Sequence, residues 1–412
     1  MRRPVMIVVF LLLLVLPAAG AAGGVSVVVD DIVLPLDAAP VIEGGRTLVP
    51  FRGLAESLGV TVDWNGAAGT VHARAPGKTV ELRINDREAL VDGHAVSLDA
   101  PPVIQQNRTL IPLRFFGEAF GATVEWSAAT RTVTVLSPPA ELYAQAFYAI
   151  RSFPQVDLIG RFDSVVFGWA RLRADGALDL EGPDFYWPAP AGTVTPETIL
   201  ESARRAGTAR YLMVFMADGE GELTTLLSGA DAAARGVREI ADFAGEKGFD
   251  GVLLDFEGLG MSSTPEELRQ VRDRFNAFVQ EMAAALRPQG MKLSLALHPL
   301  NSAYRGYDYH TLGQVADEIT IMAYEYQDAR APEPNEKVQE AVRLALGEVP
   351  AGKLVLGINV WNETPESIRA KAGLAKRYGL RGVSLWRLGL LDPSLINRLE
   401  QTVCLKQNKL IS

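Results

Sequence analysis

The chain is poor in cysteine and histidine, the residue types on which many exported and metal-binding proteins depend. Among its 412 residues it has one cysteine, Cys404, and four histidines. A single cysteine excludes an internal disulfide, so the folded state has to be stabilised by its hydrophobic cores. His72 and His94 lack the neighbouring ligands that a copper site needs. We therefore expect no metal and no cofactor.

Positive charge and phosphate-binding motifs are scarce as well. The formal net charge is −9, with 40 basic and 49 acidic side chains, and we expect no nucleic-acid partner. No glycine-rich phosphate loop follows any predicted strand, which weakens the case for an open, doubly wound nucleotide-binding sheet.

The N-terminus has the three-part pattern of a secretory signal. Two arginines precede an unbroken apolar run over residues 5–16, and Pro17 and small residues follow. The run is too short to span a bilayer comfortably. We expect a signal peptide over residues 1–23 and a secreted, extracellular or cell-wall-associated bacterial protein. An uncleaved anchor is the alternative.

An internal repeat dominates the first third of the chain. The segment APVIEGGRTLVPFRGLAESLGVTVDW, residues 39–64, returns as PPVIQQNRTLIPLRFFGEAFGATVEW, residues 101–126. In each copy a proline, Pro50 or Pro112, precedes a short amphipathic helix that Gly59 or Gly121 ends. Alternating strands follow. Each copy is predicted to be hairpin, helix, hairpin, and the two pack as one small α+β domain.

The repeat, and above all GRTLVPFR with NRTLIPLR, resembles the copper amine oxidase N-terminal-like stalk domain. We place this domain at residues 24–136, before a linker at 137–141. Its arginines offer two interpretations, a polymer-binding stripe or ion pairs with Glu56 and Glu118 that fix the fold. We favour the second and assign no chemistry to the domain, although cell-wall association through it is expected. The four arginines are Arg46, Arg52, Arg108 and Arg114.

After the linker, strands alternate with helices. Eight strand segments are found, beginning near residues 146, 164, 211, 251, 292, 318, 353 and 382. Three helices begin with Thr-Pro-Glu, at Thr195, Thr264 and Thr364, which combines a capping hydroxyl, a proline and an early acid. Eight such units predict one (β/α)8 TIM barrel over residues 142–404, with the open sheet as the alternative.

The fourth strand of that barrel, GFDGVLLDFEG, carries two acids. Leu253, Asp255 and Glu257 share one face of the strand, while the other face is apolar. An N-capping acid is the plain structural interpretation, but two carboxylates two residues apart exceed what a cap needs. A buried Glu257 beside an ionised Asp255 is expected to have a raised pKa, which suits a general acid.

Aromatic and polar residues end several other strands, and in a barrel the strand ends converge on one cleft. A tryptophan taken alone more often belongs to a core. Together with two carboxylates, the set predicts a sugar-binding cleft formed by Tyr148, Trp169, Met322, Tyr324, Glu325, Tyr326, Trp361 and Trp386.

DGVLLDFE is similar to the fourth-strand motif of glycoside hydrolase family 18, the chitinase-like barrels, and MAYEY and GVSLWRLG agree with it. The form with MxYE, and with ALHP on the fifth strand, is nearest the spore-cortex and peptidoglycan N-acetylglucosaminidase branch. The resemblance implies that Glu257 protonates the glycosidic oxygen. It implies that Asp255 and Tyr324 hold the substrate's acetamido group, and that Trp386 floors a sugar subsite.

One position departs from the family pattern. Leu253 stands where the family has an inner aspartate, so Asp255 lacks a carboxyl partner below it. We expect weaker activity or a shifted pH optimum.

The leading hypothesis is a monomeric glycosidase that cleaves β-1,4 bonds of peptidoglycan or a chitin-like glycan by a retaining, substrate-assisted mechanism. The alternative is a catalytically weak or inactive, lectin-like barrel of the cell wall. A vestigial export or sporulation scaffold is a third interpretation.

Overall fold

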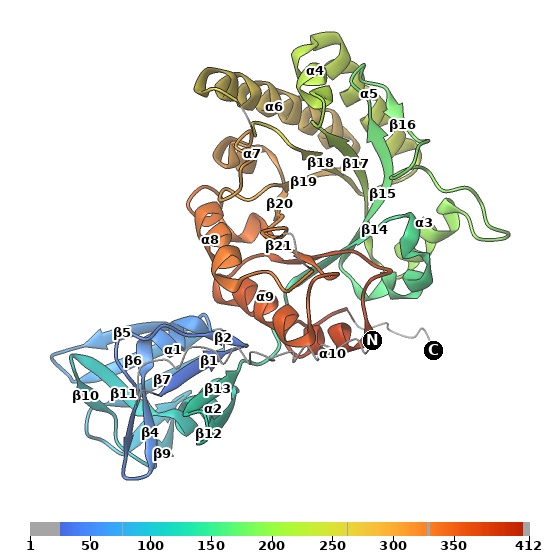
Figure 1. The fold of residues 1–412 in the computed structure, drawn as a ribbon. Coiled ribbons are helices and arrows are strands. Elements are labelled where there is room, and N and C mark those ends of the chain that lie inside the picture. Colours follow the sequence, from blue (N-terminus) through green and yellow to red (C-terminus); the bar gives the residue numbers. More distant parts are fainter. Residues whose placement is uncertain (1–24, 76, 262, 328–329, 407–412) are drawn as a thin grey trace, which may run out of the picture.

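The computed structural model describes residues 25–75, 77–261, 263–327 and 330–406. They form a small domain of strands followed by a ring of strands surrounded by helices (Figure 1). The predicted signal peptide lies outside the described residues. Within them, no helix combines the length and the apolar character needed to cross a membrane.

The small domain contains both copies of the repeat. It begins with β1 (Ser26–Val29) and β2 (Ile32–Val33), and its middle is a meander of β7 (Lys78–Arg83), β8 (Glu88–Val91) and β9 (His94–Ser97). The first copy comprises β3 (Val41–Glu43), β4 (Arg46–Pro50), α1 (Phe51–Ser57), β5 (Thr61–Asn65) and β6 (Thr70–Ala75). The second comprises β10 (Val103–Gln105), β11 (Arg108–Pro112), α2 (Leu113–Phe120), β12 (Thr123–Ser127) and β13 (Thr132–Leu136).

The two copies share one hydrophobic core, as the sequence predicted. Strands β4 and β11 pair antiparallel at the centre, with Val49 opposite Ile111. The helices meet over this pair, where the Phe51 and Phe116 rings contact edge to face with centroids 6.2 Å apart. Neither copy could bury these residues alone, so the duplication itself provides the core.

The arginines of the repeat find partners other than the expected ones. Arg46 pairs at 2.6 Å with Asp99, which precedes the second copy, and Arg108 pairs with Asp37, which precedes the first. Glu56 only reaches Arg52 at 4.0 Å. The expected pairing within each copy is therefore wrong for Arg46 and Arg108. Each of these arginines pairs with an aspartate that precedes the other copy. Only the packing of the two copies brings the arginine and the aspartate together.

Eight parallel strands form a closed barrel, because β14 pairs with both β22 and β15. This confirms the TIM barrel and rules out the open sheet. A short antiparallel strand, β16 (Leu178–Asp179), extends β15. The barrel strands are β14 (Tyr143–Tyr148), β15 (Ser164–Leu172), β17 (Ala209–Ala217), β18 (Gly251–Glu257), β19 (Lys292–Leu297), β20 (Glu318–Ile321), β21 (Leu354–Asn359) and β22 (Gly382–Trp386).

Helices cover the outside of the ring (Figure 1): α3 (Pro196–Arg205), α4 (Glu222–Ser228), α5 (Ala230–Glu246), α6 (Pro265–Leu286), α7 (Tyr309–Val315), α8 (Asn335–Leu346), α9 (Pro365–Arg377) and α10 (Pro393–Glu400). Three 3-10 helices, Ile150–Arg161, Arg287–Gln289 and Ala351–Lys353, complete the set. The Thr-Pro-Glu prediction is confirmed, since Thr195, Thr264 and Thr364 each cap a helix with their side chain.

The repeat domain docks against the barrel at α9. Asp31, in the turn between β1 and β2, forms a bidentate ion pair with Arg369 at 2.5 Å. Its neighbour Asp30 accepts hydrogen bonds from the backbone and side chain of Ser137 in the linker. Ile32 packs into the barrel's own core. One hairpin thus anchors the small domain to the side of the barrel.

Candidate active site

Strand β18 places the two acids at one mouth of the barrel. Val252, Leu254 and Phe256 pack outward against the helices. Leu253 points inward and is completely buried in the interior cluster. Because side chains alternate, Asp255 and Glu257 follow on the same inner face, each nearer the end of the strand. The alternation predicted from sequence is therefore confirmed.

Hydrogen bonds fix the end of this strand. The Tyr307 hydroxyl donates to the carbonyl of Phe256 at 2.7 Å and accepts from the amide of Leu259. The amide of Asp218, which follows β17, donates to the carbonyl of Glu257 at 3.0 Å. Gly258 turns the chain away with φ +92°, where a Cβ would lie 3.3 Å from Asp218. The Glu257 backbone is thus held between two neighbouring strand ends.

A cavity of about 450 Å³ opens above the acids. Seven of the residues predicted for the site line it, and five further residues complete its wall. The predicted ones are Asp255, Glu257, Met322, Tyr324, Glu325, Tyr326 and Trp386, and the others are His298, Pro299, Ser302, Ala303 and Tyr304. Closure of the barrel brings together side chains from β18, β22 and the segments after β19 and β20.

Burial changes the acid strength of both carboxyls. It raises the pKa of Glu257 to about 7, and the negative charge of Glu325 adds to this effect. Burial also raises the pKa of Asp255 well above its usual range, and the Glu257 charge acts in the same direction. Asp255 therefore keeps its proton to a higher pH than an ordinary aspartate does, whereas the sequence led us to expect an ionised Asp255. The pair can hold a proton near neutral pH, which suits proton donation to a leaving group.

The residue beneath the acids explains the high pKa of Asp255. Leu253 offers it no hydrogen bond, and among the described residues Asp255 Oδ1 has no hydrogen-bond partner. The interior cluster below is apolar and includes Phe147, Val166 and Met213. A negative charge placed there is poorly solvated, so the neutral carboxyl is favoured.

His298, which sequence reasoning did not assign to the site, lies beside Glu257. Its Nε2 is 3.7 Å from Glu257 Oε2, and its ring stacks on Tyr304 with centroids 4.0 Å apart. Burial lowers the pKa of His298 to about 4, so the imidazole is neutral where Glu257 titrates. His298 belongs to the ALHP segment that ends the fifth strand. The resemblance of this segment to the family is the sequence feature that could have assigned His298 to the site.

Tyr324 approaches the acids from the end of β20. Its ring is partly buried against the interior cluster, and desolvation raises the pKa of its hydroxyl, as do the nearby charges of Asp255 and Glu257. Gly357 on β21 leaves room for the ring, since a Cβ there would lie 3.2 Å from Tyr324 Cε1. The neutral hydroxyl is available as a hydrogen-bond donor in the cavity.

Trp386 contributes an indole ring to the cavity wall at the end of β22. Phe147 contacts its ring edge to face with centroids 5.1 Å apart, and Phe185 lies at 6.2 Å. Phe185 comes from the segment after β16. Trp187 packs on the outside of the barrel, against Phe243.

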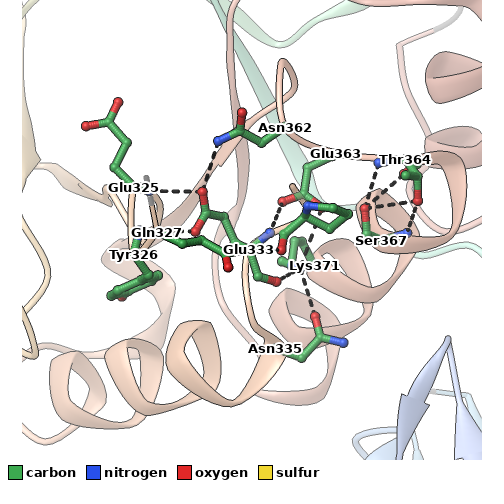
Figure 2. A network of polar contacts seen from close by, with 11 residues as sticks. Glu325, Tyr326, Gln327, Glu333, Asn335, Asn362, Glu363, Thr364, Ser367 and Lys371 are labelled. Atoms are coloured by element: carbon green, nitrogen blue, oxygen red, sulfur yellow. Dashed lines mark hydrogen bonds and ion pairs between the residues drawn. The ribbon is translucent and has the colours of Figure 1, made fainter. Parts of the chain in front are cut away.

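A buried polar network supports the segment that carries Tyr324, Glu325 and Tyr326 (Figure 2). The Glu333 carboxylate accepts from the amides of Glu325 and Tyr326 at 3.0 and 3.2 Å. Glu325 has φ +62°, so this segment is held in a conformation that its residue types rarely adopt. The Glu325 side chain points away from Glu333 (Figure 2).

The network continues away from the cavity. Asn362 donates to Glu333, and Lys371 donates to the Glu333 carbonyl and to Asn335. Lys371 also pairs with Glu363 at 3.5 Å. These partners hold Glu333 in place beneath the segment that ends β20.

Three residues predicted for sugar binding lie elsewhere. Tyr148 and Trp169 are buried on the outer face of the barrel, where their rings contact each other with centroids 5.9 Å apart. The strand phase explains the error, because Phe147 faces inward and its neighbour Tyr148 therefore faces the helices. Trp361 is exposed after β21, with the Arg330 guanidinium 3.7 Å from its ring, and does not line the cavity.

The histidines of the repeat domain lie on its strands. His72 on β6 is 3.7 Å from Glu81 on the neighbouring strand, and His94 begins β9. In the part of the chain that the structure describes, no three or more histidine, cysteine or acidic side chains are grouped to hold a metal ion.

A closed barrel with two acids at the mouth and an aromatic wall is an arrangement that glycosidases use. Comparison with known families agrees. Residues 212–363 match the family described as glycosyl hydrolases family 18, and residues 28–135 match the copper amine oxidase N-terminal domain. The family 18 match lies within the barrel, and the copper amine oxidase N-terminal match coincides with the repeat domain.

Among curated proteins, the chain is similar to the cortical fragment-lytic enzyme of Bacillus subtilis (strain 168), with 26% identity over 236 residues. That match covers 41% of this chain and 53% of the relative, so the chain spans about half of the relative's length. It is also 26% identical over 144 residues to the putative sporulation-specific glycosylase YdhD of the same organism, covering 33% of this chain and 32% of that protein.

Solved structures share the fold. The Bacillus cereus spore cortex-lytic enzyme SleL superposes with a TM-score of 0.53 at 18% identity, covering 65% of this chain and 75% of that one. A chitinase from Chromobacterium violaceum superposes with a TM-score of 0.52 at 21% identity, covering 63% of this chain and 98% of the other.

Proposed function

We propose that this protein hydrolyses β-1,4 bonds next to N-acetylglucosamine in peptidoglycan, by a retaining mechanism in which the substrate's acetamido group is the nucleophile. The observation that carries the proposal is Glu257. It is a partly buried carboxyl with a pKa raised to about 7, facing a cavity of about 450 Å³ at the mouth of a closed barrel. A chain exported through its N-terminal segment would meet this polymer in the cell wall.

The first step would break the glycosidic bond. Glu257 gives its proton to the glycosidic oxygen as the C1–O bond breaks, and the acetamido oxygen bonds to C1 to form an oxazolinium ion. Asp255 accepts a hydrogen bond from the acetamido N–H, and Tyr324 donates one to its oxygen. Asp255 is a poor nucleophile, because burial raises its pKa and favours the neutral carboxyl.

The second step would return the proton. Glu257, now ionised, removes a proton from water as that water attacks C1, and the bond from C1 to the acetamido oxygen breaks. The product keeps the β configuration and Glu257 is protonated again. The neutral His298 beside it does not compete for the proton, since burial lowers the pKa of His298 to about 4.

The choice of peptidoglycan over chitin is supported by the names of two relatives, a cortical fragment-lytic enzyme and a putative sporulation-specific glycosylase. The cleft chemistry suits either polymer. Digestion of defined muropeptides and of chito-oligosaccharides, with the new reducing sugar identified by mass, decides between them. NMR of the fresh product is expected to show the β anomer first.

The decisive variant is Glu257→Gln, which keeps the shape of the side chain and removes its proton. We expect kcat on soluble peptidoglycan to fall at least roughly 1,000-fold, while binding is kept. Glu266→Gln, an exposed change on α6, is the matched control and should leave kcat unchanged. If wild type and Glu257→Gln bind equally and neither releases reducing ends, the barrel is a lectin-like module, the alternative suggested by Leu253.

A further inference from the structure

The repeat domain carries two equivalent pockets, which are separate from the cavity of the barrel. One has a volume of about 390 Å³ and the other of about 440 Å³. They are lined by equivalent residues of the two copies, with the roles of the copies exchanged. Arg46, Arg114 and Trp126 line the first, and Arg108, Arg52 and Trp64 line the second.

Each pocket is built jointly by both copies. In the first, Arg46 of the first copy meets Asp99 at 2.6 Å, beside Arg114 and Trp126 of the second copy. In the second, Arg108 pairs with Asp37 in the same arrangement. The two ion pairs hold one guanidinium in each pocket in a fixed position. Neither pocket would exist in a single copy.

The second arginine of each pocket forms weaker interactions with the rest of the domain. Among the described residues Arg114 has no ion pair or side-chain hydrogen bond, and Arg52 only reaches Glu56 at 4.0 Å, with both side chains exposed. Both guanidinium groups can therefore receive an anionic ligand at little cost, because no strong internal pair has to break.

The tryptophans give each pocket an open aromatic face. Trp64 and Trp126 are 42% and 40% exposed, although strands of this domain bury other large apolar side chains. An indole beside guanidinium donors suits a sugar ring, whose C–H face packs on the aromatic plane while its polar groups accept hydrogen bonds. Arginine adds a preference for a carboxylate.

We propose that these twin pockets are two equivalent binding sites for a carboxylate-bearing glycan, with peptidoglycan as the occupant. Two equal sites on one rigid domain fit a polymer that repeats the same unit. Engaging both raises the affinity through effective concentration, without any further contact. This inference deepens the proposed function, since the domain would hold the barrel on its own substrate.

The test measures binding without cleavage. Full-length protein carrying Glu257→Gln is sedimented with insoluble sacculi, and Trp64→Ala and Trp126→Ala are added singly and together. We expect each single change to weaken the apparent Kd roughly three- to tenfold and the double change at least roughly thirtyfold. Val33→Ala, another exposed apolar residue of this domain that lines neither pocket, is the matched control.

A second pair of changes tests the charge without touching the tryptophans. Arg52→Gln with Arg114→Gln should weaken binding to sacculi at least tenfold and leave binding to chitin beads, which lack carboxylates, within twofold. Thermal melting of each variant within 2 °C of its parent would show that the domain still folds. These arginines are exposed or line open pockets, so we expect that result.

Several outcomes would overturn the inference. The inference fails if the double tryptophan variant binds sacculi as tightly as its parent, or if the arginine changes weaken binding to chitin equally. Binding that disappears once hydrofluoric acid has stripped phosphate polymers from the sacculi would assign the pockets to those polymers instead. None of these results depends on hydrolysis, so a barrel without activity and pockets without binding are told apart.

Discussion

The repeat domain and the barrel both place tryptophan beside charged side chains, yet they treat those groups differently. In the barrel, Trp386 lies against Phe147, and of the two carboxyls of β18 Asp255 is buried and Glu257 is partly buried. In the repeat domain, Trp64 and Trp126 are exposed beside arginines on the surface. Proton transfer requires an acid whose pKa is shifted by burial, whereas recognition of a polymer requires only accessible surfaces.

The number of sites follows from the architecture. Eight strand ends converge on one mouth when a barrel closes, so side chains far apart in the sequence meet in a single cavity. Duplication of a half-domain instead gives two sites. Each pocket takes residues from both copies, and the second pocket uses the equivalent residues with the roles of the two copies exchanged. The comparison therefore predicts one pH-sensitive site and two pH-insensitive ones.

The strongest way to break the comparison is pH. With the Glu257 pKa at about 7, kcat/KM on soluble glycan should approach a tenfold fall per pH unit well above that value. From pH 7, where half of the carboxyl is protonated, to pH 9 the fall should be about 50-fold. Binding of Glu257→Gln protein to sacculi should change less than twofold between pH 6 and pH 8.5. An activity profile that is flat over the alkaline range would contradict the assignment of Glu257 as the acid.

The raised pKa of Glu257 should also make the free energy of unfolding depend on pH. Between about pH 4.5 and 7 the folded chain keeps a proton on Glu257 that the unfolded chain has released, so the free energy of unfolding falls as the pH rises through this window. Glu257→Gln removes that dependence. At pH 8 it should be more stable than wild type by about 1 kcal/mol, allowing for the partial solvent contact of the carboxyl, and equally stable at pH 4. Denaturant unfolding at both pH values measures it.

Trp386→Ala sharpens the comparison within the barrel. Removing the aromatic wall should lower kcat/KM by roughly 30-fold, about 2 kcal/mol, mainly through KM. Trp361→Ala is the matched control, because Trp361 is exposed outside the cavity. Steady-state kinetics on a defined oligosaccharide measures both. Equal losses in the two variants would show that the cavity is not where the sugar binds.

Glu333→Gln gives the smallest expected effect and tests positioning. The neutral amide accepts more weakly from the Glu325 and Tyr326 amides, so we expect kcat to fall roughly fivefold, about 1 kcal/mol, with KM and sacculus binding unchanged. Glu336→Gln, an exposed change at the start of α8, is the control. A rise in KM with kcat preserved would mean that Glu333 acts on substrate binding instead.

The sequence predicted most of the site on strands of clear phase. The alternation of β18 placed Asp255 and Glu257 on the inner face, and the MAYEY and GVSLW segments located Tyr324 and Trp386. It failed where the phase was ambiguous, since the apolar segments around Tyr148 and Trp169 are hydrophobic on both faces. His298 was missed because a histidine after a strand has no meaning until the neighbouring strand end is known.

By itself the sequence determined the eight βα units, the duplicated half-domain and the acid-bearing strand, because each is encoded by local periodicity, capping and turn residues. Only the tertiary structure decided which side chains meet. Closure of the barrel set His298 beside Glu257, and the packing of the two copies joined Arg46 to Asp99. Such proximities join residues distant in sequence, and burial, which sets the pKa values, exists only once the chain has folded.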